Sequence, residues 1–262
     1  MQALSTAASG LTYQQKNVDD HANNIANLMT TAFKRSVTVP KDLAYLNYQS
    51  AGTPTSSSDT MTPTGMYMGM GVRAAGIMRV MEQGEIEITD NPLDVMVQGE
   101  GFFQVELPTG ETGFTRDGRF SLNPERQLIT LEGYKVKPDL SLPAEATKIE
   151  INRQGQVYAT IQGQPAPVLV GQFEMATFAN TRGLEPIGNN LYKETVASGS
   201  PTSGVADAIG FGAILQNALE GSNVKPVVEL TALIEAQRAY AMNTKTMNAV
   251  EEMDRNLETL MR

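Results

Sequence analysis

Few side chains in this sequence are placed to do chemistry, and the first of them is a lone histidine. His21 is the only histidine in 262 residues, so a Ser-His-Asp triad or a multi-histidine metal site would have to use it. Asp19 and Asp20 precede it, and it lies beside an apolar stripe that contains Ala22 and Ile25. Because no further carboxylate pattern is nearby, a polar histidine on a helix face is the simpler interpretation.

Two motifs rich in glycine and methionine bear on a cofactor and a metal. Residues 69–74 (GMGVRA) fit the loose dinucleotide pattern GxGxxA, which is informative only between a strand and a helix. No βαβ pattern surrounds this stretch. Met61, Met66, Met68 and Met70 are thioethers that could bind Cu(I), but clustered methionines more often provide adaptable packing. We therefore predict neither a cofactor-binding nor a metal site.

Carboxylates are plentiful, yet none stands in a recognisable acid–base pair. Asp90, Asp94 and Asp117 lie in or near the turn-like stretches TDNPLD and RDG, where aspartate hydrogen-bonds to its own backbone. Tryptophan, which often stacks on sugars, is absent. We predict no catalytic residue and no enzyme.

Composition excludes several classes of partner and site. The net charge of −9 argues against nucleic acid or an anionic membrane surface, because both need clustered Lys and Arg. The absence of cysteine excludes disulfides, thiolate catalysis and cysteine-ligated metals. The first cation is Lys16, so a secretory signal is not expected, and no apolar run approaches the length of a membrane span. We expect a soluble protein that is not exported by a cleaved signal peptide.

Any functional surface must be positioned by secondary-structure elements, and the clearest of these are amphipathic segments at the two ends of the chain. An apolar 4-3-4-3 spacing at the N-terminus, broken only by Gln15, includes Leu4, Ala8, Leu11, Val18, Ala22, Ile25 and Met29. A similar spacing at the C-terminus, with two polar breaks, includes Leu233, Ala236, Tyr240, Asn243, Met247, Val250, Asp254, Leu257 and Met261. These narrow seams predict helices at about 3–28 and 226–260 that pack on other helices, with Pro226 in the first turn of the second.

Strand patterns dominate between the two helices. Residues 38–76 are rich in Thr, Ser, Gly, Met and Pro and predict an extended or loosely ordered connection. From about 80 to 205, alternating apolar residues are separated by turn signals: PTG after Phe103, Val105 and Leu107, then Asp117-Gly118, Glu132-Gly133 and two QG pairs. We predict hairpins at these places.

The expected fold class is α+β, with three parts. The terminal helices, 1–30 plus 226–262, form one helical domain, coiled-coil-like in its seam. Residues 31–79 plus 206–225 form an extended connecting region, and residues 80–205 form a compact all-β domain. Because a helix with a narrow seam is marginal alone in water, the seams indicate surfaces for a partner.

Five stretches carry a resemblance that covers nearly the whole chain. ANNIAN with TTAFKR (22–27 and 30–35), NPLDVMVQGEGFFQV (91–105), GFTRDGRFSL (113–122), GLEPIGNNLYKET (183–195) and LEGSNVKPVVELTALIEAQRAYAMNTK (219–245) occur in this order. Together they resemble the rod and hook proteins, the axial components of the bacterial flagellum. Length and the Gly/Ser/Thr/Pro-rich stretch are most similar to distal rod members, and proximal rod members of similar size are the alternative.

The resemblance implies a structural subunit that assembles with copies of itself into an open helical tube and carries motor torque to the hook. It implies other rod and hook proteins, the basal-body rings and the flagellar type III export apparatus as partners, at the periplasm-spanning rod. It implies no nucleic acid and no membrane insertion. The residues expected at the subunit interface are Leu4, Leu11, Val18, Asn23, Asn24, Ile25, Asn27, Phe33, Lys34, Leu233, Tyr240, Met247, Val250 and Leu257.

Three asparagines at the end of the first helix call for an explanation, because asparagine is a poor helix former. Asn23, Asn24 and Asn27 either bond to adjacent subunits or cap the end of their own helix. Phe33 would anchor the turn that follows, and Lys34 and Arg35 would meet the last helix carbonyls.

The sequence also departs from the family pattern at two turns. The family usually has Gly where this chain has Ala32, which puts a left-handed helix end in doubt. The stretch NPERQL (123–128) lacks the usual hairpin Gly. Two other classes of function stay open: a secreted β-domain enzyme, and an adaptor whose coiled coil closes as a dimer or trimer.

Overall fold

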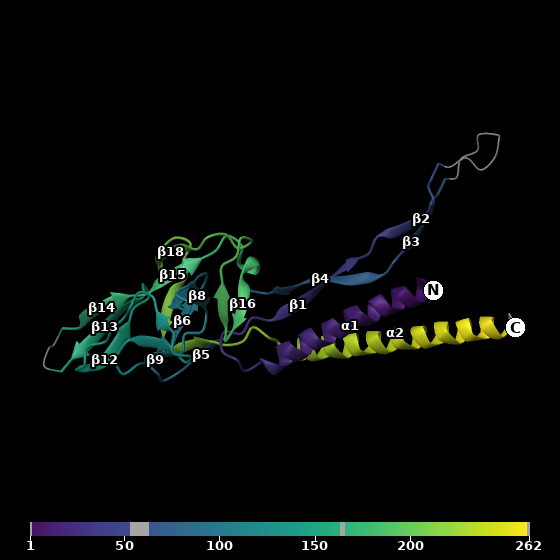
Figure 1. The fold of residues 1–262 in the computed structure, drawn as a ribbon. Coiled ribbons are helices and arrows are strands. Elements are labelled where there is room, and N and C mark those ends of the chain that lie inside the picture. Colours follow the sequence, from purple (N-terminus) through teal and green to yellow (C-terminus); the bar gives the residue numbers. More distant parts are fainter. Residues whose placement is uncertain (1, 53–62, 163–165, 261–262) are drawn as a thin grey trace. The chain divides into compact units, whose positions relative to one another are not determined.

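The computed structural model describes residues 2–52, 63–162 and 166–260. The chain forms two compact units, which we describe separately (Figure 1). Unit 1 comprises residues 1–26, 36–79 and 225–262, and unit 2 comprises residues 27–35 and 80–224. This division differs from the expected boundaries, since 31–35 and 206–224 belong with the β-rich unit and 36–79 with the helices.

Unit 1 is built on two long helices, α1 (Gln2–Ala26) and α2 (Pro226–Leu260). They lie side by side and run in opposite directions (Figure 1). Pro226 opens α2, where its missing N–H is not needed. The predicted terminal helices and the α+β class are therefore confirmed, with α1 ending at Ala26, before the predicted residue 28.

Two antiparallel ribbons complete unit 1. β1 (Ser36–Asp42) pairs with β4 (Val72–Arg79), and β2 (Tyr45–Gln49) pairs with β3 (Met66–Gly69). The β1–β4 register shifts between Val39 and Pro40, where proline cannot donate a ladder hydrogen bond. The segment that we expected to be extended or loosely ordered is thus extended in much of its described part, where it forms paired strands.

Unit 2 consists mainly of β-strands around two core clusters. The largest sheet has the strand order β16-β17-β8-β7-β11-β10-β9, and β15 joins it by pairing with both β7 and β18. Smaller sheets pair β12-β13-β14, β19-β6 and β20-β5. The strands are β5 (Ile86–Ile88), β6 (Val95–Gln98), β7 (Phe102–Glu106), β8 (Thr112–Thr115), β9 (Phe120–Leu122), β10 (Leu128–Thr130), β11 (Lys135–Val136), β12 (Ala146–Ile151), β13 (Gln156–Ile161), β14 (Val168–Gln172), β15 (Glu174–Thr177), β16 (Glu185–Gly188), β17 (Leu191–Lys193), β18 (Thr202–Val205), β19 (Ala213–Gln216) and β20 (Ala218–Glu220), with a short 3₁₀ helix at Thr181–Gly183.

Strand β7 supplies both cores, because successive side chains point to opposite faces of a sheet. Phe103 and Val105 enter the larger cluster, where the Phe103 ring lies 5.2 Å from that of Phe120. Phe102 enters the smaller cluster, where its ring lies 5.9 Å from that of Tyr192. The alternation read from the sequence is confirmed on this strand.

Most of the predicted hairpins form, and one does not. β7–β8, β10–β11 and β12–β13 are antiparallel pairs across PTG, Glu132-Gly133 and the first QG turn, while the second QG turn includes a residue outside the described part of the chain. The hairpin predicted at Asp117-Gly118 is wrong, because β8 pairs with β17 and β9 with β10. Gly118 instead passes against Val95, whose N–H donates to the Gly118 carbonyl at 3.0 Å.

Candidate assembly surface

The seam between α1 and α2 is only partly covered by the chain itself. Ala236 and Val250 are buried on α2, and Gly10 of α1 lies so close to Asn243 that an added Cβ would be 3.0 Å from Nδ2. Tyr240 and Leu257 are 42% and 57% exposed. Among the other predicted seam residues, those that are partly buried are Leu4, Leu11, Val18, Ile25, Leu233, Asn243, Met247 and Asp254. Ala8, Gln15, Ala22 and Met29 are exposed, and Met261 lies outside the described residues. The helix pair therefore retains apolar surface.

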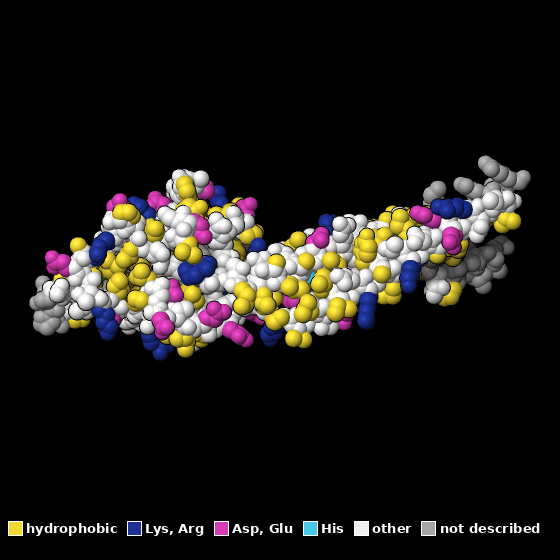
Figure 2. Space-filling model, turned by 90° about the horizontal axis from the view of Figure 1, so that it is seen from below, with side chains coloured by type: hydrophobic (Ala, Val, Ile, Leu, Met, Phe, Trp, Pro, Cys, Tyr) yellow, Lys and Arg dark blue, Asp and Glu magenta, His cyan; other side chains and the backbone are white. Residues whose placement is uncertain are grey.

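A further apolar face lies on α2 outside the pair. Its exposed members are Val227, Val228, Leu230, Ile234, Met242, Met253 and Leu260. Figure 2 shows hydrophobic side chains gathered in patches along the helical unit, with few charges between them. We call these seven residues the α2 outer face. Large apolar side chains that gather exposed on one side of a helix are typical of protein interaction sites.

The β2–β3 hairpin exposes large side chains as well. Tyr45, Tyr48, Met66, Tyr67 and Met68 are all more than two-fifths exposed. Met61, one of the four methionines considered as Cu(I) ligands, lies outside the described residues. Methionine and tyrosine adapt to irregular neighbours, so this hairpin is suited to packing on another chain.

Gly71, the second glycine of the GMGVRA stretch, lies where no larger residue fits. Gly71 has φ of +109°, and a Cβ on it would lie 2.1 Å from the Ser9 hydroxyl oxygen of α1. The same hydroxyl accepts a hydrogen bond from the Val72 N–H at 3.2 Å. Close approach of the ribbon to the helix thus accounts for glycine at this position.

The contacts of Asn24 account for one of the three asparagines at the end of α1. Its side chain is fully buried, and its Nδ2 and Oδ1 bond to the carbonyl and N–H of Ser36 at 2.8 and 2.9 Å. Nδ2 also donates to Glu229 Oε2 at 3.2 Å, and that oxygen lies 2.6 Å from His21 Nδ1. Asp20 accepts from the Ser36 hydroxyl. Asn24 therefore bonds within its own chain to β1 and α2, which is neither of the two roles considered for it.

The other two asparagines have different surroundings. Asn23 is exposed. Asn27 is partly buried, and its Oδ1 accepts from the Thr30 hydroxyl at 3.2 Å. Asn27 thus contributes to the turn that follows α1, while Asn23 presents its side chain at the surface of unit 1.

The turn after α1 is anchored in unit 2 by a buried charge cluster. Lys34 Nζ donates to the Glu82 carbonyl at 2.7 Å and pairs with Glu220. Arg116 Nη1 lies 3.4 Å from Glu220 Oε2, and its guanidinium lies 5.2 Å from the centre of the Phe102 ring. Lys34, Glu220 and Arg116 are 1%, 1% and 6% exposed. Lys34 thus binds a carboxylate in place of its expected role at the helix carbonyls, and Phe33 is buried beside it, as an anchor would be.

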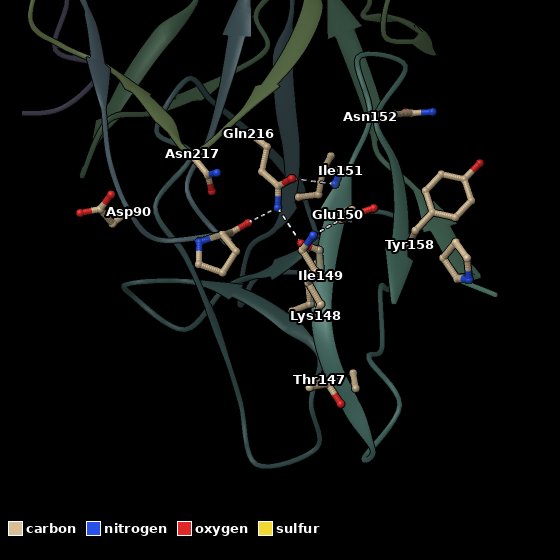
Figure 3. A pocket seen from close by; sticks show the side chains of 13 residues that line it. Asp90, Thr147, Lys148, Ile149, Glu150, Ile151, Asn152, Tyr158, Gln216 and Asn217 are labelled. Atoms are coloured by element: carbon tan, nitrogen blue, oxygen red, sulfur yellow. Dashed lines mark hydrogen bonds and ion pairs between the residues drawn. The ribbon is translucent and has the colours of Figure 1, made fainter. Parts of the chain in front are cut away.

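An open groove lies beside β12. It has a volume of about 920 Å³ and is lined by Asp90, Lys148, Glu150 and Gln216 among others. Figure 3 shows Gln216 lying along the strand edge, where it accepts from Ile151 N–H at 2.9 Å and donates to the Ile149 and Pro92 carbonyls. Gln216 therefore occupies the place of a neighbouring strand and protects this edge from pairing.

Neither a metal-binding cluster nor a membrane-spanning helix occurs among the described residues. No group of three or more His, Cys, Asp or Glu side chains in them is arranged to hold a metal ion. Within the same ranges, neither helix combines the length and the apolar character needed to cross a membrane.

Comparison with known proteins identifies the family. Residues 96–159 match the flagellar hook protein FlgE/F/G D1 domain, and residues 215–260 match the flagellar basal body rod FlgEFG protein C-terminal region. The chain is 47% identical to a protein of Caulobacter vibrioides named flagellar basal-body rod protein FlgG, over 97% of both chains. It is 42% identical to the FlgG protein of Agrobacterium fabrum, again over 97% of both. The chain belongs to the flagellar basal-body rod protein family.

Three residues of this rod protein that sequence reasoning missed are Glu220, Asn223 and Glu229. All three lie in the LEGSNVKPVVEL stretch that carried the family resemblance. Glu220 bonds to Lys34 and Asn223 bonds to Arg35, both in the TTAFKR stretch, and Glu229 bonds to Asn24 in the ANNIAN stretch. The one signal in the sequence that could have pointed to them is that the LEGSNVKPVVEL stretch and the ANNIAN and TTAFKR stretches all contain polar residues. Nothing in the one sequence shows that these stretches meet.

Lys34 gives this rod protein a pH-dependent stability. Burial lowers the pKa of Lys34 below its ordinary value, against the opposing effect of Glu220. Between that lowered pKa and the ordinary value in the unfolded chain, the unfolded state binds more protons, so stability rises with pH. We expect the wild type to become more stable relative to Lys34→Met as the pH rises from about 7 to 10. The unfolding free energy of the wild type minus that of Lys34→Met should therefore increase over this range. Urea unfolding of both proteins measures this, and a difference that stays flat or falls would contradict it.

Proposed function

We propose that this chain is a structural subunit of the flagellar rod, which assembles with copies of itself through unit 1 into an open helical tube. The tube carries torque from the motor to the hook, and the subunit catalyses no reaction. The observation that carries this proposal is the apolar surface left on unit 1, on a chain that matches rod proteins over nearly its whole length.

The kind of surface supports an open polymer. The α2 outer face and the β2–β3 hairpin are two different surfaces, each with exposed apolar side chains. When one face of a subunit binds a different face of the next, the contact does not close on itself and assembly continues as a helix. Among the predicted interface residues, Asn23, Tyr240 and Leu257 are exposed and suited to a neighbouring copy, whereas Asn24, Phe33, Lys34 and Val250 are buried by their own chain.

The distal rod is the position that the comparisons favour. Within Caulobacter vibrioides, the chain is 47% identical to the rod protein FlgG and 34% identical to the rod protein FlgF. We therefore assign this chain to the distal rod, next to other rod and hook proteins and inside the basal-body rings. We further propose that the flagellar type III apparatus exports it without a cleaved signal peptide.

A single charge on the α2 outer face should separate assembly from folding. Ile234 is 49% exposed, so Ile234→Asp should leave the unfolding transition of the subunit almost unchanged. Burying that charge between copies costs well over 1.4 kcal/mol, which is tenfold in an equilibrium constant. We expect the lowest concentration that gives sedimenting polymer to rise at least about tenfold.

Asn248→Asp is the matched control, because it adds the same charge to an exposed position of α2 without removing an apolar group. It should assemble much closer to the wild type. Polymer formation by Ile234→Asp at the wild-type concentration would refute the α2 outer face as an interface. Concentrated wild type that stays a closed dimer or trimer would favour the adaptor class instead.

A further inference from the structure

A groove lies between α1 and β4 within unit 1. It has a volume of about 400 Å³, and its lining includes Lys16, Asp19 and Asn23 from the helix and Ala74, Gly76 and Ile77 from the strand. α1 packs on α2 as well as on β1 and β4 (Figure 1). Because α1 and β4 supply the lining of the groove, the groove and the α2 outer face are two different surfaces of the same unit.

Gly76 is a residue of this groove that its own chain does not explain. It lies inside β4, where glycine has no side chain to pack and loses more entropy than other residues. Its φ is outside the left-handed region, and an added Cβ would have no described atom within 4 Å. Glycine inside a strand often marks a place where another backbone or a ligand approaches closely. The open space at Gly76 therefore suits an approach from another molecule.

The α1 wall of the groove presents two charges in a fixed order. Lys16 and Asp19 are exposed, and neither forms an ion pair with another described residue. Asp20 also lines the groove, but it is buried and accepts from the hydroxyls of Ser36 and Thr38. The groove thus presents a cation and then a carboxylate, about 4.5 Å apart along the helix axis.

The α2 outer face presents a ridge with the opposite order of charges. Leu230, Ile234, Arg238 and Met242 are exposed and four positions apart, so they form one of the rows that pack into grooves. Glu235 is exposed three positions before Arg238, and neither of the two forms an ion pair with another described residue. The ridge thus presents a carboxylate and then a cation, with the same spacing as the groove.

We propose that the α2 ridge of one copy docks in the groove between α1 and β4 of a second copy, with the two helices parallel. Lys16 then pairs with Glu235, and Asp19 pairs with Arg238. In the antiparallel orientation like charges would meet, which is disfavoured at an interface. The inference rests on the proposed function, since it names the surfaces through which copies assemble. Because ridge and groove are different surfaces, the contact continues from copy to copy.

Gly76→Val tests the groove without disturbing the fold. The added carbons enter open space, and valine suits a strand, so the urea midpoint of unfolding should not fall. The lowest concentration that gives sedimenting polymer should rise at least about tenfold, because the groove is filled. Ala75→Val is the matched control, since it adds the same kind of bulk at an exposed neighbour that does not line the groove. It should assemble like the wild type.

Two charge reversals test which surfaces meet. Asp19→Arg and Arg238→Glu should each raise the lowest polymer-forming concentration at least about tenfold when assayed alone, because like charges then face each other. An equal mixture of the two should polymerise close to the wild-type concentration. In the mixture the reversed groove accepts the reversed ridge, and the unreversed groove accepts the unreversed ridge. Arg255→Glu, at an exposed position of α2 outside the ridge, should assemble like the wild type.

The outcomes separate this inference from the proposed function. Polymer formation by Gly76→Val and by both reversals at the wild-type concentration would show that the groove serves another partner or none, and would overturn the inference alone. A mixture that recovers nothing would overturn it as well, because the reversed surfaces would then not be partners. Wild type that forms no polymer at any concentration would overturn the proposed function, and the inference with it.

Discussion

Glu220→Ala is expected to destabilise unit 2 by about 3–5 kcal/mol, because it leaves two buried cations without their shared carboxylate. The side chains of Lys34, Arg116 and Glu220 are 1%, 7% and 0% exposed. Glu220 Oε1 also accepts from the Gly84 N–H at 3.0 Å, which would lose its partner. Urea unfolding followed by circular dichroism in the β-sheet region measures the change.

A surface ion pair provides the control for this prediction. Glu150 pairs with Lys148 at 2.6 Å, but the two side chains are 54% and 69% exposed. Glu150→Ala should therefore cost less than about 1 kcal/mol. A similarly small loss for Glu220→Ala would show that water reaches Lys34 and Arg116.

The triple variant Lys34→Met, Arg116→Met, Glu220→Leu distinguishes two explanations of the loss. If the cost of Glu220→Ala comes from unpaired buried charge, removing all three charges should recover much of the lost stability. If the loss comes instead from the missing attraction between the charged groups, the triple variant should be no more stable than the single one, because both lack that attraction. We expect recovery, because burial lowers the pKa values of both Lys34 and Arg116 even with Glu220 present.

Features that depend on neighbouring residues could be predicted from the sequence. The two helices follow from the 3.6-residue period of their apolar positions, and the Gly110 and Gly133 turns follow from positive φ at glycine. The hairpin predicted at Asp117-Gly118 failed for a non-local reason: Val95, 23 positions before Gly118, takes the place of the expected partner strand. Turn chemistry shows where a chain bends, but it does not show which strand comes next to it.

The candidate site depended on contacts that a single sequence does not contain. Lys34 and Glu220 are 186 positions apart, and Asn24 and Glu229 are 205 apart. From the sequence alone, local explanations are equally good: Lys34 fits a role at the helix carbonyls, and Asn24 fits a cap or a contact with a neighbouring subunit. Only the fold shows that Lys34 and Asn24 both contact the LEGSNVKPVVEL stretch, through Glu220 and Glu229.

Ala32→Val is expected to destabilise unit 2 by about 3 kcal/mol, for two additive reasons. Ala32 has φ of +58°, a left-handed conformation that costs an ordinary L-residue roughly 1–2 kcal/mol and a β-branched residue more. It is also 0% exposed, so the two added methyl groups have no room, which typically costs about 1–3 kcal/mol. The doubt raised by alanine at this position is thus resolved: the left-handed turn forms without glycine.

Ala32→Gly is the control that isolates the backbone. Glycine removes the left-handed strain of roughly 1–2 kcal/mol, but it loses a buried methyl worth about 0.8 kcal/mol and adds unfolded-state entropy of about 0.5–1 kcal/mol. The net change should therefore stay within about 1 kcal/mol. If Ala32→Val were as mild as Ala32→Gly in urea unfolding, a positive φ at this residue would be refuted.

The backbone conformation at Ala32 also affects the buried charge cluster of Lys34, Glu220 and Arg116. The Ala32 N–H donates to the Glu220 carbonyl at 2.6 Å, two residues before Lys34 meets the side chain of the same glutamate. A valine that pushes the backbone at position 32 away should therefore weaken the Lys34–Glu220 pair as well, and its effect should not add to that of Glu220→Ala. Measuring the double variant Ala32→Val, Glu220→Ala tests this coupling, because independent sites would give the sum of the two losses.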